Sequence, residues 1–204
     1  MLYTDEQLAE LKEKISLRMS KKRFFHTLGV ERCAKKLGEL VLPNKVQELR
    51  AAALLHDIAK EIPIDTQFEI LENHSFLLTD EDRLTTGVIH SFTAPIIVES
   101  DFLDFAQPDI LSAVLNHTLG CENMSTFDKI IFVSDYAEDT RPFESCIAVR
   151  DFLFEDIEKL SKNERIKRLD DAFLMALNGV IEALTRLQQP INSRIYITQN
   201  FYKR

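Results

Sequence analysis

Glycine and proline are scarce in this sequence, with five glycines and six prolines among 204 residues. Sharp turns depend heavily on these two residues, and an all-β protein needs many such turns. No stretch approaches the roughly 18 consecutive apolar residues that a membrane-spanning helix requires. The scarcity argues against an all-β fold, and the lack of long apolar runs predicts that the protein has no membrane partner.

Cysteine is also rare, and its three copies, Cys33, Cys121 and Cys146, lie far apart without a C-x-x-C pair. An odd number of dispersed cysteines is typical of free thiols in a reducing compartment. The first six residues include neither the basic nor the apolar region of a signal peptide. We therefore expect a cytoplasmic protein.

The chain lacks a basic excess, since its formal net charge is −8. Binding to duplex nucleic acid needs a basic surface that neutralises phosphates. The cluster Lys21-Lys22-Arg23 is too short to reverse this balance, although it could serve a small polyphosphate. We expect a small-molecule partner and no duplex nucleic acid.

Helical periodicity dominates what is present, and the length suits one domain. We therefore predict an all-α fold, a single compact helical bundle over residues 1–204. A short element should follow Pro190. The expected helices cover about residues 4–18, 21–37, 44–62, 65–72, 80–99, 108–120, 125–139, 145–161 and 165–188.

Four histidines and two aspartates fall on the predicted inward faces of these helices. His56, for example, follows Leu49, Ala52 and Ala53 by seven, four and three residues. A single inward histidine is more often a hydrogen-bonded core residue, but a buried aspartate needs a cation or strong donors. Together the six side chains offer enough ligands for two metal ions. These candidate ligands are His26, His56, Asp57, His90, His117 and Asp135, whereas His74 lies in a polar stretch and is expected at the surface.

The adjacent pair His56-Asp57 and the segments around the other candidates resemble the HD-domain metal-dependent phosphohydrolases. Within that family they are most similar to the YqeK-like symmetrical dinucleoside tetraphosphate hydrolases of bacteria. The segment His117-Thr-Leu-Gly120 and the helix after Met124 are the more specific part of this resemblance. The similar segments are Lys22–Val30, Ala53–Lys60, Asn116–Gly120 and Met124–Arg141.

The resemblance implies a two-metal centre in which Asp57 bridges the ions and is essential for catalysis. Imidazole and carboxylate ligands suit iron, manganese, cobalt or zinc, and the resemblance favours iron. The implied ligand sets are His26, His56, Asp57 and Asp135 for one ion, and Asp57, His90 and His117 for the other.

Three cations and two hydroxyls near these ligands are candidate substrate contacts. Lys60 lies one turn beyond His56, and Arg23 lies one turn before His26, so both could reach the same cavity. We expect Arg23, Lys60 and Arg141 to hold phosphate and Lys60 to take part in catalysis; the alternative is that they are solvated surface charges. Thr27 and Thr118 adjoin ligand histidines and could bind phosphate or the local backbone.

The function implied by the resemblance is symmetrical cleavage of diadenosine tetraphosphate to two ADP through a hydroxide bridging the two metals. Asp139 is a candidate proton donor to the leaving group. Another HD-type phosphohydrolase, a nucleotidase or cyclic-dinucleotide phosphodiesterase, is the alternative enzyme. The alternative from a different class is a metal-bearing nucleotide sensor with little turnover.

The predicted catalytic core covers about residues 20–142, with C-terminal helices over residues 145–204 packing on it. The tail is rich in large apolar side chains between Ile195 and Tyr202. These side chains could seal the bundle or form the contact of a homodimer, and we favour sealing.

Overall fold

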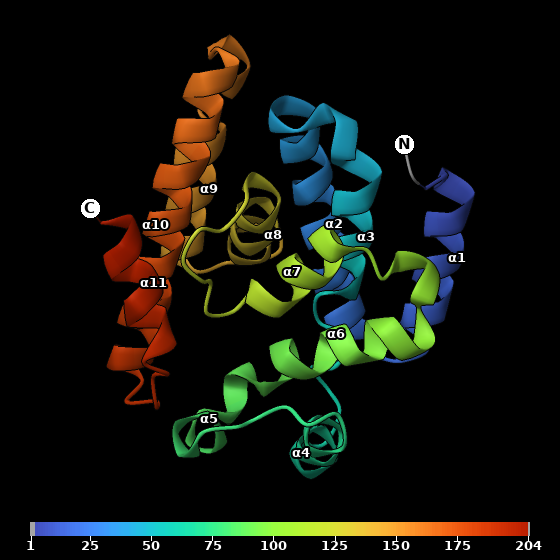
Figure 1. Cartoon of the computed structure of the whole chain (residues 1–204). Helices are drawn as coiled ribbons and strands as arrows, with labels where there is room; N and C mark the ends of the chain where they lie inside the picture. The colour runs from blue at the N-terminus through green and yellow to red at the C-terminus, as the bar shows by residue number, and fades with distance from the viewer. Residues whose placement is uncertain (1–2, 204) are drawn as a thin grey trace.

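The computed structural model describes residues 3–203, so the ends of the predicted domain, residues 1–2 and 204, lie outside the described residues. Within that range the chain forms eleven α-helices, four short 3₁₀ helices and no strand, which confirms the predicted all-α fold (Figure 1). The α-helices are α1 Asp5–Ser16, α2 Lys21–Val41, α3 Val46–Leu55, α4 Ile64–Asn73, α5 Asp80–Leu84, α6 Ile89–Asp101, α7 Pro108–Asn116, α8 Thr126–Ala137, α9 Glu144–Phe154, α10 Lys162–Arg186 and α11 Arg194–Tyr202. The 3₁₀ helices are η1 Pro43–Lys45, η2 Thr86–Val88, η3 Leu103–Phe105 and η4 Ile157–Lys159.

Side-chain caps fix the starts of several helices. Thr4 accepts a hydrogen bond from the backbone of Gln7, whose side chain accepts one from the backbone of Thr4. Ser125 and Asp128 form the same reciprocal pair at the start of α8. Each pair satisfies two polar groups that a helix end would otherwise leave without partners. The helix starts predicted at Thr4 and Ser125 are therefore confirmed.

Several helix ends differ from the prediction: α2 continues to Val41, α9 ends at Phe154, and three further differences lie close to candidate ligands. The helix predicted to continue to about residue 62 ends at Leu55, and residues 56–62 continue as tight turns. The helix predicted over residues 80–99 is divided into α5, η2 and α6, and α7 ends at Asn116. In residues 56–62, backbone hydrogen bonds between residues three apart replace those of the α-helix; the nitrogen of Lys60, for example, donates to the carbonyl oxygen of Asp57. His56 and His117 consequently occupy helix C-caps.

Helix α8 lies at the centre of the bundle and packs against α2, α3, α7, α9 and α10. Its inward side chains Ile130, Ile131 and Phe132 are buried, and Phe132 meets Phe173 of α10 edge to face. Burial of such large apolar side chains is the main favourable contribution to folding. This packing places α8, which carries Asp135 near its end, between the N-terminal helices α2 and α3 and the long helix α10 (Figure 1).

The C-terminal tail packs on the bundle through Tyr202. Its ring meets Phe173, and its hydroxyl accepts a hydrogen bond of 2.6 Å from the backbone nitrogen of Met124. The tail therefore covers the bundle through Ile195 and Tyr202, as favoured from the sequence, whereas Tyr196 and Ile197 are exposed and a homodimer contact stays a prediction. Among the helices of residues 3–203, none combines the length and apolar character that a membrane crossing demands.

Candidate metal centre and active site

Five structural elements bring the six predicted ligands into two adjoining groups. One group combines α2, the C-cap of α3 and α8; the other combines the turn after α3, α6 and the C-cap of α7. Within each group the candidate ligand atoms lie within 4.8 Å of one another. The groups are His26, His56 and Asp135, and Asp57, His90 and His117.

Asp57 lies between the two groups and faces both. Its Oδ1 atom is 3.2 Å from Nε2 of His90 and 3.7 Å from Nε2 of His117. Its Oδ2 atom is 3.3 Å from Nε2 of His56 and 3.8 Å from Nε2 of His26. Each carboxylate oxygen thus belongs to a different group, an arrangement in which one aspartate can bind two cations at once.

Hydrogen bonds on the far side of three imidazole rings fix their orientation. Nδ1 of His56 donates to the carbonyl oxygen of Ala53 at 2.6 Å, and Nδ1 of His117 donates to that of Val114 at 2.7 Å. Nδ1 of His26 lies 3.2 Å from a carboxylate oxygen of Glu138, to which it donates. A ring that donates through Nδ1 presents a lone pair at Nε2, the form that ligates metals.

These residues fit divalent metal ions. The buried Nε2 atoms of His26 and His56 have no hydrogen-bond partner among the described residues, although Asp135 Oδ1 is 3.0 Å from the former. Nε2 of His90 and Nε2 of His117 face each other at 3.0 Å. Converging imidazole lone pairs and carboxylates suit iron, manganese, cobalt or zinc.

The electrostatics keep both carboxylates ionised. Burial opposes ionisation of Asp57, but His56 and the hydrogen-bonded imidazoles hold its pKa well below the usual value. Burial likewise opposes ionisation of Asp135, and Arg141 and His26 outweigh it. Burial lowers the pKa of His90 to about 4, so this ring is neutral near pH 7. The two ionised carboxylates place negative charge inside the protein, which a bound cation would offset.

The three predicted phosphate-binding cations all lie at this centre. Arg23 Nη1 is 2.6 Å from Asp57 Oδ2, and Arg141 Nη2 is 2.7 Å from Asp135 Oδ1. Lys60 Nζ lies 3.3 Å from Nδ1 of a ligand histidine, His90, and burial lowers its pKa. The Nε groups of both arginines are buried and have no partner among residues 3–203. These three side chains therefore place N–H donors close to the position where a phosphate would contact the bound metal ions.

The other predicted contacts are placed differently. Thr27 is fully buried and its hydroxyl faces the sulfur of Met19 at 3.7 Å, so the structure does not bring it to the centre. Asp139 is exposed and pairs with Arg32 at 2.7 Å, away from the ligands. His74 is exposed, as predicted. Thr118 does lie beside the centre, on the wall of a cavity.

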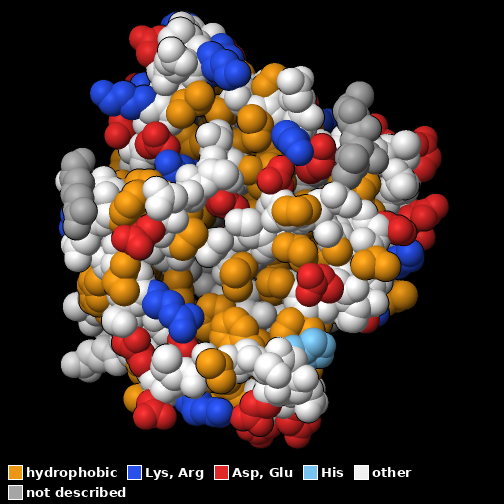
Figure 2. Space-filling view, viewed as in Figure 1, with side chains coloured by type: hydrophobic (Ala, Val, Ile, Leu, Met, Phe, Trp, Pro, Cys, Tyr) orange, Lys and Arg blue, Asp and Glu red, His pale blue; other side chains and the backbone are white. Residues whose placement is uncertain are grey.

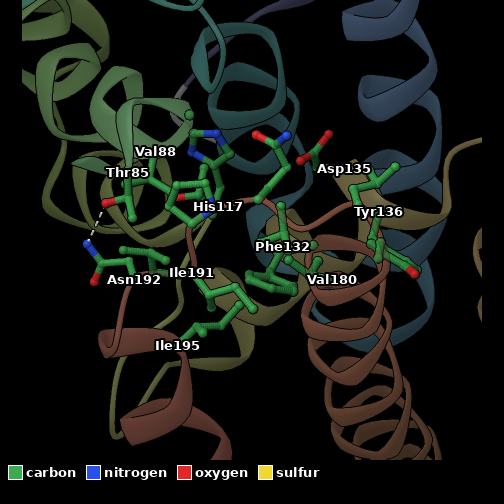
Figure 3. A pocket seen from close by; sticks show the side chains of 18 of the residues that line it. Thr85, Val88, His117, Phe132, Asp135, Tyr136, Val180, Ile191, Asn192 and Ile195 are labelled. Atoms are coloured by element: carbon green, nitrogen blue, oxygen red, sulfur yellow. Dashed lines mark hydrogen bonds between the residues drawn. The ribbon is translucent and has the colours of Figure 1, made fainter. Parts of the chain in front are cut away.

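This cavity has a volume of about 570 Å³ and begins at the metal centre, where His117, Asp135 and Arg141 line it. It continues between α8 and α10 to Ile195 of α11, and most of its wall is apolar (Figure 3). Small-molecule sites have volumes of about 300–1,000 Å³ and mainly apolar walls. The sequence did not reveal this cavity, because four stretches distant in sequence form it, within residues 84–88, 117–119, 132–146 and 180–195.

Glu138 is a second feature that the sequence reading missed. Its side chain is fully buried and accepts from His26 and from the hydroxyl and backbone nitrogen of Thr140, both at 2.6 Å. A Cβ atom at Gly29 would lie 2.3 Å from Glu138 Oε2, so the glycine makes room for this carboxylate. The sequence signal for this arrangement was Gly29, which lies three residues after His26 on the same helix face and leaves room there for another side chain.

Comparison with known proteins agrees with this geometry. The HD domain family matches residues 23–139. A relative from Bacillus subtilis (strain 168), named symmetrical bis(5'-nucleosyl)-tetraphosphatase, is 25% identical over 97% of this chain and 96% of its own length. A relative of the same name from Halalkalibacterium halodurans is 28% identical over 89% of both chains.

A solved structure from Clostridium acetobutylicum, described as a "predicted HD superfamily hydrolase involved in NAD metabolism", has a TM-score of 0.81 to this chain. The two chains are 26% identical, with 96% of each covered. The family match spans more than half of the sequence and contains the candidate ligand residues His26, His56, Asp57, His90, His117 and Asp135. The resemblance seen in the sequence is thus confirmed, and the chain belongs to the HD-domain family of hydrolases.

Proposed function

We propose that this protein hydrolyses diadenosine tetraphosphate at its centre to give two ADP. The observation that carries the proposal is the pair of ligand groups sharing Asp57 at the mouth of a nucleoside-sized cavity. The names of the two relatives over nearly the whole chain support this substrate. Of the metals that suit the ligands, we propose iron, which the family resemblance favours.

The residues of the centre have distinct roles in this proposal. Two cations, when bound, would supply a nucleophilic water of lowered pKa and stabilise charge on the phosphoryl oxygens. The four imidazoles and Asp135 would hold them, and Asp57 would hold both at a fixed separation. Arg23 and Arg141 would donate hydrogen bonds to phosphoryl oxygens, where preorganised donors stabilise the transition state. Lys60 would add a third donor beside His90.

We include α9, α10 and α11 in the catalytic unit rather than treating them as an appendage. Cys146 of α9, Val180 of α10 and Ile195 of α11 line the cavity together with residues of the central helices. Helix α10 also packs directly against α2 and α8, which carry His26 and Asp135. Substrate binding in this proposal therefore depends on residues beyond the family match at 23–139.

Product analysis tests the proposal most directly. Iron-loaded protein, purified without oxygen and incubated with diadenosine tetraphosphate, is expected to release only ADP, measured by chromatography. ATP with AMP would contradict the position of attack. If metal is bound but no turnover occurs, assays with nucleoside monophosphates and cyclic dinucleotides separate another phosphohydrolase from a nucleotide sensor, and either outcome overturns the proposed substrate.

Replacing Arg141 with glutamine tests the proposed phosphate contact. The loss of one preorganised donor at a phosphoryl oxygen is expected to lower kcat/KM by about 10²- to 10³-fold. Arg32→Gln is the matched control, because Arg32 pairs with the exposed Asp139 outside the ligand groups. Steady-state kinetics should show near-normal turnover in the control; equal activity in both variants would remove Arg141 from the proposed mechanism.

A further inference from the structure

The cavity beside the metal centre has a mainly apolar wall, with polar side chains that include His117, Thr118 and Asn192. Figure 3 shows His117 and Asp135 at one end, with Phe132, Val180 and Ile195 along the apolar wall. In the space-filling view, hydrophobic side chains gather around a hollow near the middle of this face (Figure 2). An apolar chamber that opens at a phosphate-cleaving centre suits the base and sugar of a nucleotide.

Thr118 lies on the cavity wall next to the candidate ligand His117, and its hydroxyl proton is used in a hydrogen bond to Ser91. The hydroxyl of the fully buried Ser91 donates to the carbonyl oxygen of Val88 at 2.8 Å. Ser91 has only this one proton, so in its 2.9 Å contact with Thr118 the threonine must be the donor. The Thr118 oxygen can therefore offer a ligand a hydrogen-bond acceptor but no proton.

The polar side chain across the cavity is occupied by other partners. The amide nitrogen of Asn192 donates to Asp82 and to Thr85, at 2.9 and 3.0 Å. Its carbonyl oxygen accepts from the backbone nitrogen of Arg194 at 3.1 Å. The bond between Thr85 and Asn192 is the dashed line in Figure 3. Asn192 is thus held by the protein itself, whereas Thr118 offers an acceptor beside the candidate ligand His117.

An acceptor at this position disfavours phosphate and favours a hydroxyl group. Phosphate oxygens carry no proton to donate when ionised, so they would be repelled by the Thr118 oxygen. In a nucleotide the first hydrogen-bond donors beyond the phosphates are the ribose hydroxyls, and the base follows. We propose that the cavity receives the nucleoside of the substrate and that Thr118 accepts a hydrogen bond from one ribose hydroxyl, selecting nucleotides that carry this hydroxyl over the deoxy analogue that lacks it. The inference rests on the proposed function for the identity of the nucleotide.

Binding of ADP, 2'-deoxy-ADP and 3'-deoxy-ADP to the metal-loaded protein, measured by titration calorimetry, tests this inference. The unchanged protein should bind ADP about 3- to 10-fold more tightly than one of the two deoxy analogues, the range expected for one neutral hydrogen bond. Thr118→Val should bind all three equally because it keeps the shape but removes the acceptor. Thr118→Ser should restore the preference, and bound metal, measured by mass spectrometry, should match in every variant.

Thr66→Val is the matched control, since Thr66 is exposed on α4 and does not line the cavity, and it should keep the preference for ADP. Equal binding of the three nucleotides by the unchanged protein, or a preference that survives in Thr118→Val, would overturn the inference. So would turnover of diadenosine tetraphosphate without ADP binding. If the protein shows the ribose preference but does not cleave diadenosine tetraphosphate, the inference about Thr118 holds and the proposed substrate is wrong.

Discussion

Asp57→Asn is expected to lower kcat/KM for diadenosine tetraphosphate by more than about 10³-fold, beyond the loss of a single transition-state donor. Asp57 is 4% exposed and its two oxygens face different ligand groups, so the substitution weakens both metal positions together. Asparagine keeps the shape of the side chain but loses the charge that offsets bound cations. Kinetics and metal content by mass spectrometry should both show the loss.

The Asp57→Asn variant should still fold, because the substitution removes a charge but leaves the packing of the hydrophobic core unchanged. The melting temperature of the metal-free variant is expected to stay within about 5 °C of the unchanged protein, corresponding to roughly 1–2 kcal/mol in a domain of this size. Asp139→Asn is the matched control, since that carboxylate is exposed and paired only with Arg32. Full activity of Asp57→Asn with normal metal content would exclude a shared two-metal centre.

The sequence predicted which six side chains converge better than it predicted how the helices present them. Inward spacing placed His26 and Asp135 on buried helix faces, and both lie there. For His56 and Asp57 the spacing suggested a continuous helix, in which adjacent side chains diverge by about 100°. The helix instead ends at Leu55, and the following turn allows both side chains to face the same centre. Tertiary packing, which a local pattern does not contain, decides where that helix ends.

The same geometry explains the different positions of Thr27 and Thr118. Both follow a ligand histidine directly and were equal candidates in the sequence. Thr27 lies in the middle of α2, where the next residue points to another face, and it is buried against Met19. Thr118 follows a C-cap, where the chain leaves the helix, and it reaches the cavity. A residue next to a candidate ligand in sequence can therefore be placed at the site only when the local backbone conformation is known.

Glu138 orients a ligand without touching the metal positions, so its replacement should weaken metal binding. Its carboxylate accepts from His26 Nδ1 and is held by two bonds from Thr140. Loss of such a partner typically lowers metal affinity about 10- to 100-fold. In Glu138→Gln the amide would place a donor against the Thr140 donors, and we expect an affinity loss in that range, measured by competition with a chelator of known affinity.

Gly29→Ala separates this orienting role from a role in folding. A Cβ atom there would lie 2.3 Å from Glu138 Oε2 and 3.0 Å from its Cδ, so the carboxylate must move away from His26. Alanine is also favoured over glycine inside a helix by about 1 kcal/mol, so helix α2 itself gains stability. We expect metal affinity to fall while the melting temperature of the metal-free protein is maintained. Gly87→Ala is the matched control, because a Cβ atom there meets no atom within 4 Å. Unchanged metal affinity in both Gly29→Ala and Glu138→Gln would show that His26 keeps its ligand orientation without Glu138.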